Sequence, residues 1–188
     1  MRPKVAGVVL AAGSSTRMGR NKLLLDLGGE PVVRRAVRSA LEARLDPVIV
    51  VLGHEADRVG GELAGLDCLT ALNPDHELGV GTSIRTGVAR APADASALLL
   101  ILADMPFVTA SMLEALVDRY GDIPAPPNLF DRSLFSELLA NDDEHGARQV
   151  IRRHQANAVF VSWPADALRD LDVAEDYAQV RAQLAERR

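Results

Sequence analysis

The chain has 188 residues, 48% of them hydrophobic but only 4% aromatic, which favours one domain with a sizeable core of Ala, Val, Leu and Ile. Its 21 basic and 26 acidic residues give a net charge of −5, so it lacks the basic field expected of a sequence-independent nucleic-acid binder. The single cysteine, Cys68, excludes a disulfide framework and a cysteine zinc site, and it favours the reducing environment of the cytoplasm.

Apolar runs along the chain predict buried β-strands. Val5–Leu10, Pro47–Leu52 and Ala97–Leu102 are aliphatic runs without polar alternation, as expected of parallel strands that are buried on both faces. Asp67–Leu72 is a further apolar run, and Ala158–Trp163 has the composition of a strand. The first run is too short to cross a membrane, so we expect no membrane span and no membrane partner.

Helical patterns lie between these runs. Pro31 fits the first helical position of its segment, and Thr109 fits the N-cap of another. The predicted helices are 31–45, 55–63, 83–89, 109–120, 131–140, 147–154 and 174–188, and the Pro-rich residues 121–128 are predicted to form a loop. Alternating strands and helices predict a single-domain α/β protein over residues 1–188, a three-layer sandwich with a mostly parallel, Rossmann-like sheet.

The loop after the first predicted strand has the features of a phosphate-binding loop. It runs from Leu10 to Lys22 with the sequence LAAGSSTRMGRNK, and it leaves the strand end where open α/β sheets place ligands. Its small residues let backbone N–H groups approach an anion closely, and Arg17 and Lys22 add positive charge. A solvated loop with incidental basic residues is the alternative interpretation.

Two well-known phosphate-binding loops do not fit this segment. A Walker A loop needs Lys followed by Ser or Thr, whereas Lys22 is followed by Leu23. The dinucleotide-binding pattern needs a second glycine where Ser15 stands. The loop therefore belongs to neither class.

A second polar segment follows the run that ends at Leu72. It spans Asn73–Gly87, NPDHELGVGTSIRTG, in which glycines precede Thr82 and Ser83 at the expected start of a helix. Hydroxyls and free N–H groups at such a place suit a ribose, a base edge or a phosphate. A plain helix N-cap is the alternative for the two hydroxyl residues.

Asp104 follows the most apolar strand, in the sequence LADMPF. A carboxylate there lies at the carboxyl edge of the predicted sheet, beside the first loop, and Pro106 restricts the turn. Because Mg²⁺ prefers one or two carboxylates together with phosphate oxygens and water, Asp104 is the natural metal ligand. A role as an acidic cap of the next helix is the alternative.

The first loop, LAAGSSTRMGRNKLL, resembles the signature loop of the MobA-like nucleotidyltransferases, which include molybdenum cofactor cytidylyltransferases and guanylyltransferases. The resemblance covers nearly the whole chain and implies the fold of nucleotide-diphospho-sugar transferases. It implies that the loop wraps a triphosphate and that Arg17, Lys22 and Asp104 are catalytic. The nucleotide-binding residues that it implies are Leu10, Ala11, Ala12, Gly13, Ser14, Ser15, Arg17, Lys22, Asn73, Gly79 and Ser83.

The resemblance extends to the metal site. LADMP matches a family motif whose Asp binds Mg²⁺, which again assigns Asp104. DLDVAED, residues 170–176, resembles the family pattern D-[IV]-[DN]-T-P-E-D and assigns Asp172 as the second metal ligand, although Val173 and Ala174 replace the usual Thr-Pro. The alternative for Asp172 is an acidic residue favoured by the dipole of the last helix.

The acceptor region departs furthest from the family. Residues 120–131 are about ten residues short of a strand with its usual loop. DEHGAR, residues 143–148, resembles the family's Gly-Asp-x-Gly-Ala-Arg, with Asp143 for the first Gly and Glu144 for the Asp. Gly146 and Arg148 remain and are the implied acceptor-binding residues.

The second alanine of the loop, Ala12, favours one donor within the family. The form LAAG is similar to cytidylyltransferases, whereas LAGG is typical of guanylyltransferases. The resemblance therefore implies transfer of CMP from CTP to the phosphate of molybdopterin, with Mg²⁺ as cofactor and a molybdoenzyme as recipient of the product. Two alternatives stay open: a nucleotidyltransferase that uses a sugar phosphate or GTP, and a non-catalytic chaperone that binds nucleotide and cofactor.

Overall fold

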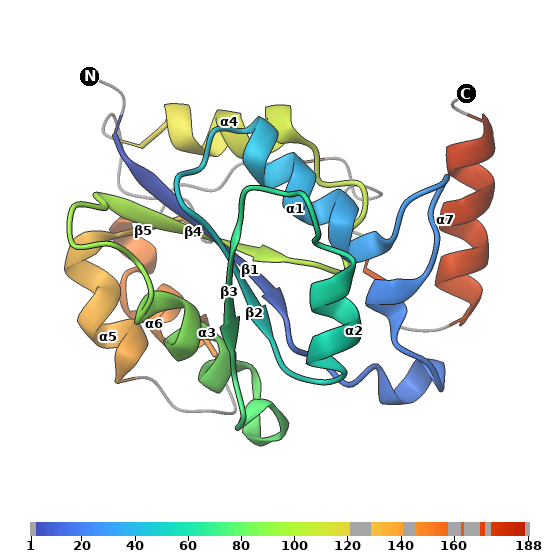
Figure 1. Ribbon diagram of the computed structural model, residues 1–188. Helices are drawn as coiled ribbons and strands as arrows, with labels where there is room; N and C mark the ends of the chain where they lie inside the picture. Colours follow the sequence, from blue (N-terminus) through green and yellow to red (C-terminus); the bar gives the residue numbers. More distant parts are fainter. Residues whose placement is uncertain are drawn as a thin grey trace.

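A computed structural model describes residues 3–120, 129–140, 146–157, 163, 170–171 and 174–186. Its sheet has five strands in the order β3-β2-β1-β4-β5 (Figure 1). The strands are β1 (Val5–Ala11), β2 (Val48–Leu52), β3 (Leu69–Leu72), β4 (Ala97–Leu102) and β5 (Leu129–Asp131). The first four strands are parallel to one another and β5 is antiparallel to β4, so the predicted mostly parallel α/β sheet is confirmed.

The register of the central strands brings several strand ends to one edge. Ala11 of β1 lies opposite Leu52 of β2, and Leu10 lies opposite Leu102 of β4. The chain therefore leaves β1, β2 and β4 at the same level of the sheet. The loops that follow these three strands meet at this edge, which is where open α/β sheets bind ligands.

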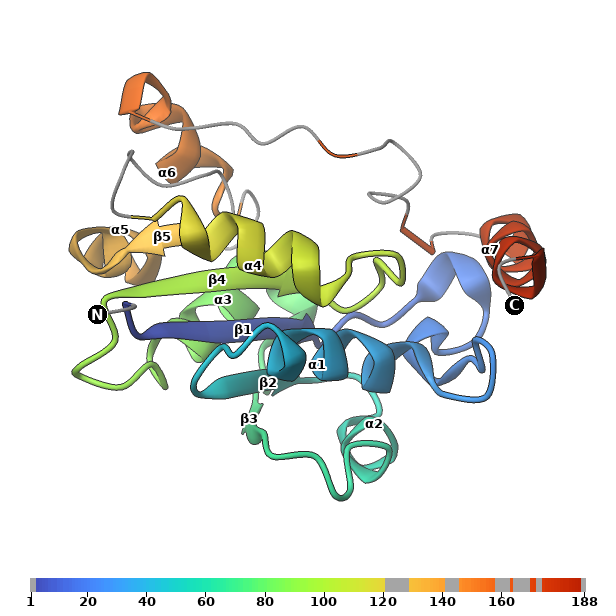
Figure 2. The ribbon, with the colours of Figure 1, turned by 90° about the horizontal axis from the view of Figure 1, so that it is seen from above.

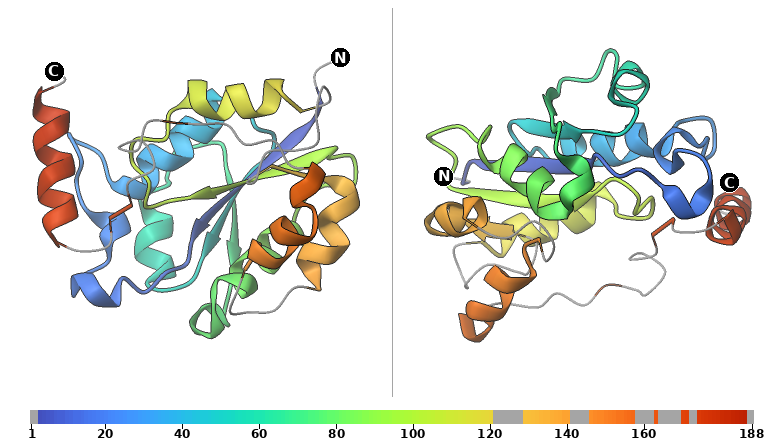
Figure 3. Two further views of the ribbon diagram at one scale, coloured as in Figure 1. Left: turned by 180° about the vertical axis from the view of Figure 1, so that it is seen from behind. Right: turned by 90° about the horizontal axis from the view of Figure 1, so that it is seen from below.

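Helices cover both faces of the sheet, as Figures 2 and 3 show. Alternate side chains of β1 divide between the faces, with Val5 and Val9 in one core cluster and Ala6 in another. The cluster with Val5 and Val9 includes residues of α1 (Val32–Glu42), α2 (Ala56–Gly61), α4 (Ala110–Asp118) and α7 (Ala174–Glu186). The cluster with Ala6 includes residues of α3 (Val80–Val88), α5 (Phe135–Leu139) and α6 (Arg148–Arg153).

Helix α3 packs directly on β1 and β2 through a glycine. A Cβ atom on Gly87 would overlap Cγ1 of Val8 and lie 3.2 Å from Cγ2 of Val51. Only a residue without a side chain allows this approach. The close packing fixes α3 against the sheet and so fixes its first turn beside the strand ends.

Some helices begin at other residues than predicted. Helix α1 begins at Val32, because Pro31 has an extended backbone (φ −63°, ψ 147°) and is the N-cap rather than the first helical residue. Thr109 is the N-cap of α4, as predicted, and its hydroxyl accepts from the Met112 N–H at 3.4 Å. Helix α3 begins at Val80 rather than Ser83, because Gly79 adopts φ 133° and ψ 169° and lets the chain turn into the helix earlier. Thr82 and Ser83 consequently lie inside the first turn instead of before it.

The region after residue 128 contains a strand that the sequence did not predict. The predicted helix over 131–140 begins only after β5, as a 3₁₀ helix at Arg132–Leu134 that continues into α5. Asp131 ends the strand and caps the 3₁₀ helix, since its carboxylate accepts from the Ser133 N–H at 2.8 Å. A strand of three residues is too short for period-two alternation to be recognised.

Some predicted elements lie outside the described residues. These are the loop over 121–128 and, apart from Trp163, the strand over 158–163. Within the part of the chain that the structure describes, no helix is both long enough and apolar enough to cross a membrane.

Candidate active site

A pocket of about 420 Å³ lies at the carboxyl ends of β1 and β4. Three segments form it: the loop after β1, the segment that leads into α3, and the end of β4. Its lining residues are Leu10, Ala12, Gly13, Ser14, Ser15, Thr16, Lys22, Leu23, His76, Glu77, Gly79, Val80, Ser83, Leu102 and Asp104. The three segments singled out in the sequence therefore meet in one place.

Two left-handed residues shape the loop after β1. Ser15 has φ 52° and Gly19 has φ 66°, and they flank the 3₁₀ helix η1 (Thr16–Met18). The Ser15 hydroxyl accepts from the backbone N–H of Lys22 at 3.2 Å, which ties the two ends of the loop together. A left-handed serine is uncommon, so this turn is set by the whole loop rather than by local preference.

Lys22 and Asp104 form an ion pair inside the pocket. The Lys22 Nζ lies 2.6 Å from Asp104 Oδ2, and the two side chains are only 14% and 21% exposed. Lys22 begins the 3₁₀ helix η2 (Lys22–Leu24), whereas Asp104 follows β4. The structure thus brings together the predicted phosphate-binding cation and the predicted metal-binding carboxylate.

The backbone around Asp104 is held from two sides. The N–H of Ala103 donates to the Leu10 carbonyl at 3.2 Å, which joins this turn to the start of the first loop. The N–H of Leu171 donates to the Asp104 carbonyl at 3.2 Å, and Leu171 is fully buried. Asp172, the predicted second metal ligand, lies outside the described residues, but the residue before it contacts Asp104.

The described residues include one candidate metal ligand in the pocket, Asp104. Among them, no group of three or more His, Cys, Asp or Glu side chains is placed to enclose an ion. Asp104 supplies a carboxylate in a pocket with room for phosphates, and Mg²⁺ is commonly bound by one or two carboxylates, phosphate oxygens and water. The carboxylate of Asp104 is therefore a suitable ligand for a divalent cation in this pocket.

Asn73 supports the pocket wall through buried hydrogen bonds to the first turn of α3. Its side chain is 2% exposed, and its Nδ2 donates to the hydroxyls of Thr82 at 2.8 Å and Ser83 at 3.0 Å. Gly79 and Ser83 line the pocket, whereas Asn73 is not among the lining residues. The structure therefore gives Asn73 a supporting position, and its direct contact with nucleotide stays a prediction.

His76 is a pocket residue that the sequence analysis did not single out. A Cβ atom on Gly53 would lie 2.7 Å from the His76 side chain and 2.8 Å from Cβ of Ala12, so the three residues are tightly packed. The Nδ1 atom of His76 is buried and has no hydrogen-bond partner among the described residues. His76 lies within the polar segment 73–87, but its position in that segment follows no residue spacing that would predict a role in the pocket.

A second cavity of about 670 Å³ lies on the other side of the same loop. Ser14, Ser15 and Thr16 line both cavities, so this part of the loop is a partition between them. Glu55 and Arg58 both line this cavity and pair with each other, and the hydrogen bond from Arg58 lowers the pKa of Glu55. These two charges neutralise each other locally.

Four other predicted site residues lie away from the pocket or are described only in part. Gly146 is buried with φ 54°, and a Cβ there would lie 2.6 Å from Cγ1 of Val80, so it packs against α3. Arg148 begins α6 and is exposed, outside the pocket lining. Ala11 is buried in the core, and Arg17 is placed by its backbone in η1, with its side chain outside the described part.

The sequence and the fold match known proteins over most of the chain. Residues 7–159 match the MobA-like NTP transferase domain. The chain is 32% identical to the purine catabolism protein PucB of Bacillus subtilis (strain 168), in an alignment that covers 97% of this chain and 98% of PucB.

Solved structures with the same fold cover the whole molecule. An Rv0371c homologue from Mycobacterium sp. strain JC1 matches with a TM-score of 0.88 and 27% identity, over 100% of both chains. Rv0371c of Mycobacterium tuberculosis H37Rv in complex with manganese matches with a TM-score of 0.76 and 25% identity, over 95% of this chain and 98% of that one. A protein of this fold has therefore been crystallised with a divalent cation.

Proposed function

The chain belongs to the MobA-like NTP transferase family, and on that premise we propose that it transfers CMP from CTP to the phosphate of molybdopterin with release of pyrophosphate. Nucleotidyl transfer from a nucleoside triphosphate is the activity of the superfamily to which the chain's relatives belong. The proposal names CTP as the donor, molybdopterin as the acceptor and Mg²⁺ as the cofactor, and each of these three assignments rests on particular residues.

The contact between Lys22 and Asp104 is the observation that carries the proposal. Their side chains meet at 2.6 Å within a pocket framed by the small residues of the loop after β1. A lysine attracts phosphate as a point charge, while a carboxylate attracts a divalent cation. A bound triphosphate with its metal satisfies both groups at once, and a pocket of about 420 Å³ is of the size that binds small molecules.

The reaction needs positioning and charge neutralisation more than a general base. An acceptor phosphate oxygen is already ionised at neutral pH, so it can attack the α-phosphorus without losing a proton. The new bond joins this oxygen to the α-phosphorus, the bond from the α-phosphorus to the bridging oxygen breaks, and pyrophosphate leaves. Catalysis of such transfers depends mainly on alignment and on stabilising the developing charge.

Residues of the loop after β1 would stabilise the leaving pyrophosphate. Lys22, Gly13 and Ser14 line the pocket, so the lysine ammonium and the backbone of the two small residues are available to bound phosphates. Arg17 joins them on the family resemblance. Asp104 and, on the same resemblance, Asp172 would hold Mg²⁺, which when bound neutralises negative charge on the phosphates.

The choice of a pyrimidine donor rests on Ala12. Ala12 lines the pocket and is 5% exposed, wedged beside His76 and Gly53. The Ala12 methyl group helps to set the packing of Gly53 and His76 behind the pocket wall, and a glycine at this position would loosen that wall. The resemblance of LAAG to cytidylyltransferases points to CTP as the donor.

The acceptor rests on fewer observations. PucB is named for purine catabolism, which gives no acceptor, so molybdopterin is inferred from the resemblance around Gly146 and Arg148. Cytoplasmic location, a single domain over residues 1–188 and a molybdoenzyme that receives the product are further parts of this proposal.

The proposal is tested by pyrophosphate release with Mg²⁺, each of CTP, GTP, ATP and UTP, and either molybdopterin or a panel of sugar phosphates as acceptor. Release only with CTP and molybdopterin is the expected result. Release only with a sugar phosphate would discard the acceptor, and release only with GTP would discard the donor. Tight nucleotide binding without pyrophosphate release in any combination would replace the enzyme with a binding protein.

A further inference from the structure

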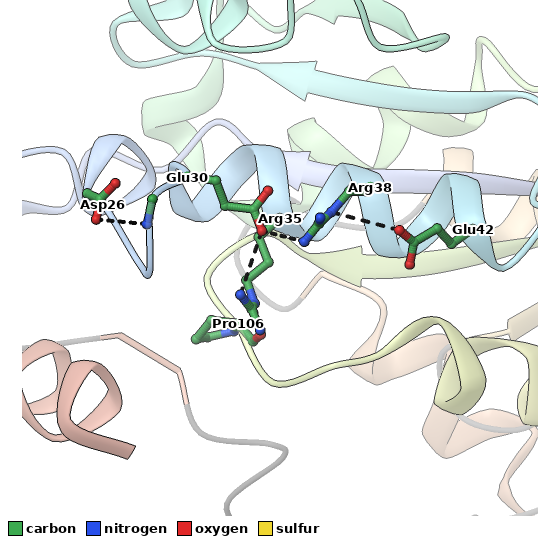
Figure 4. A network of polar contacts seen from close by, with 7 residues as sticks. Asp26, Glu30, Arg35, Arg38, Glu42 and Pro106 are labelled. Carbon is green, nitrogen blue, oxygen red and sulfur yellow. Dashed lines mark hydrogen bonds and ion pairs between the residues drawn. The ribbon is translucent and has the colours of Figure 1, made fainter. Parts of the chain in front are cut away.

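The turn that carries Asp104 is held by a side chain from a different layer of the fold. Pro106 is buried and, as a proline, has no N–H, but its carbonyl oxygen accepts a hydrogen bond from Arg35 Nε at 2.9 Å. Arg35 lies on α1, and Figure 4 shows its side chain reaching from this helix to Pro106. This bond joins α1 to the residues that follow β4.

A carboxylate at the start of α1 orients Arg35. The Oε1 atom of Glu30 lies 3.6 Å from Arg35 NH1 and accepts from Arg38 NH2 at 2.5 Å, as Figure 4 shows. The Glu30 and Arg35 side chains are 19% and 28% exposed, whereas Arg38 is 50% exposed. Glu30 and Arg35 are therefore the less exposed residues of this network, and Arg35 is the one that contacts Pro106.

Helix α1 holds the other member of the active-site pair as well. The N–H of Val32 donates to the Leu25 carbonyl at 3.0 Å, and the N–H of Leu25 donates to the Lys22 carbonyl at 3.2 Å. The beginning of α1 is thus linked by short paths to both Lys22 and Asp104. The relative position of the two charged groups depends on both links.

We propose that Arg35 is a positioning residue for the active site: by donating Nε–H to the Pro106 carbonyl, it fixes the turn that presents Asp104 to Lys22 and to the substrate phosphates. This inference rests on the proposed function for its catalytic consequence but not for its structural one. Groups that orient a metal ligand without touching the metal typically affect activity by about 10- to 100-fold.

Arg34 offers a matched control on the same helix. Its NH1 also donates to backbone carbonyls, those of Glu62 at 2.7 Å and Ala64 at 3.0 Å, which lie after α2 and away from Asp104. Arg34 and Arg35 are both half-buried. Arg34→Met and Arg35→Met therefore remove the same chemical group from one helix, but only the second releases the Asp104 turn.

Backbone hydrogen exchange, measured by mass spectrometry on the full chain, tests the structural consequence. In Arg35→Met the amides of 103–108 should exchange at least about 10-fold faster than in the wild type, because Met105 and Val108 lose the anchor of their turn. In Arg34→Met the faster exchange should appear in 62–66 instead. Unchanged protection of 103–108 in Arg35→Met would overturn the inference, whether or not the chain is an active enzyme.

Pyrophosphate-release kinetics test the catalytic consequence. For Arg35→Met we expect kcat to fall about 10-fold, the Mg²⁺ concentration for half-maximal activity to rise, and the KM for the nucleotide to stay within about threefold. Arg35→Lys keeps a donor and should recover part of the loss, and it also serves if Arg35→Met folds poorly. If the wild type is active and Arg35→Met matches Arg34→Met in kcat and in Mg²⁺ dependence, the inference is overturned. The proposed function then stays intact. An inactive wild type would remove the proposed function and leave hydrogen exchange to decide the position of Arg35.

Discussion

Compared with the region from β1 to β4, the described residues of the region from β5 to α6 contribute packing rather than polar groups to the pocket. The described residues that line the pocket lie between Leu10 and Asp104. In the later region, Gly146 packs against Val80 of α3, and Val80 in turn lines the pocket. Strand ends therefore place the groups assigned to the nucleotide, whereas the groups assigned to the acceptor depend on how the later helices dock against α3.

The two regions are also attached to the sheet in different ways. β1, β2 and β4 consist mainly of buried aliphatic residues, whereas side-chain hydrogen bonds add to the buried residues that hold β5 at the edge of the sheet. The Tyr120 hydroxyl oxygen lies 2.8 Å from the Ser96 carbonyl oxygen and 2.6 Å from Asp131 Oδ2, so its one proton is shared between two acceptors. Burial raises the pKa of Tyr120, and the contact with Asp131 raises it further, so the hydroxyl keeps its proton and remains a donor. The comparison predicts large effects on chemistry from the first region and mainly effects on stability from the second.

The largest effect should come from Asp104→Asn, which removes the metal-binding charge and preserves the side-chain shape. We expect kcat to fall at least about 1000-fold, with loss of Mg²⁺-dependent turnover. Asp94→Asn is the control, because Asp94 also pairs with a lysine, Lys4, at 2.9 Å, but on the surface. Retained metal dependence in Asp104→Asn would remove Asp104 from the site.

Lys22→Met should follow, because it removes the cation and keeps most of the aliphatic stem. The expected loss is about 100-fold in kcat/KM, or about 3 kcal/mol of transition-state stabilisation. Lys4→Met supplies the matching surface change and should leave steady-state kinetics unaltered. Near-normal turnover of Lys22→Met would contradict the role of the loop after β1.

Gly146→Ala tests whether the later region acts through packing. The new Cβ meets Cγ1 of Val80 at 2.6 Å in a left-handed backbone, so we expect a loss of about 2 kcal/mol in the free energy of unfolding. Gly65→Ala measures the cost of the left-handed backbone alone, since Gly65 has φ 80° and no atom lies within 4 Å of the Cβ that alanine would add. Equal urea midpoints for the two variants would mean that contact with α3 contributes nothing.

Ala12→Gly tests donor choice within the first region, since it changes the pocket wall and leaves every charged residue in place. Removal of one methyl group should shift the ratio of kcat/KM for CTP and GTP by about 10-fold towards GTP. The measurement is competition between the two nucleotides with a common acceptor. A ratio that does not move would separate donor choice from Ala12.

The smallest effect concerns the later region alone. The hydrogen bond with His154, at 2.8 Å, and the ion pair with Arg153, at 2.6 Å, lower the pKa of Glu137 below 4.5. The ionised carboxylate therefore stabilises the fold above pH 4.5, and this contribution is lost as the pH falls through the lowered pKa. Glu137→Gln should cost less than about 1 kcal/mol at pH 7, and urea unfolding at pH 3 should show a smaller difference from wild type.

The first region could be predicted closely because its signals are local. Three continuous aliphatic runs identified β1, β2 and β4, and a further apolar run covers β3. The strand-end rule placed Asp104 and the loop after β1 at one edge. The ion pair between Lys22 and Asp104 could not be predicted, because it depends on the left-handed turn at Ser15. The early start of α3 depends in the same way on the backbone of Gly79.

The later region was harder to predict for reasons that the structure makes clear. β5 has three residues and lies at an edge, so it carries no periodic signal. Within the first region, Arg35 and His76 carried no recognisable sequence signal either, since one acts through a backbone carbonyl and the other through packing on a glycine. Contacts of this kind arise only when distant segments are folded together.

The central claim is attack on the α-phosphorus of a nucleoside triphosphate, and isotope labelling tests it most directly. CTP labelled with ³²P at the α or the γ position is incubated with Mg²⁺, the protein and molybdopterin, and the products are separated. Nucleotidyl transfer predicts that the α-label enters the acceptor product and the γ-label enters pyrophosphate. Appearance of the γ-label in the acceptor, or in inorganic phosphate, would mean phosphoryl transfer or hydrolysis and would contradict the assigned chemistry.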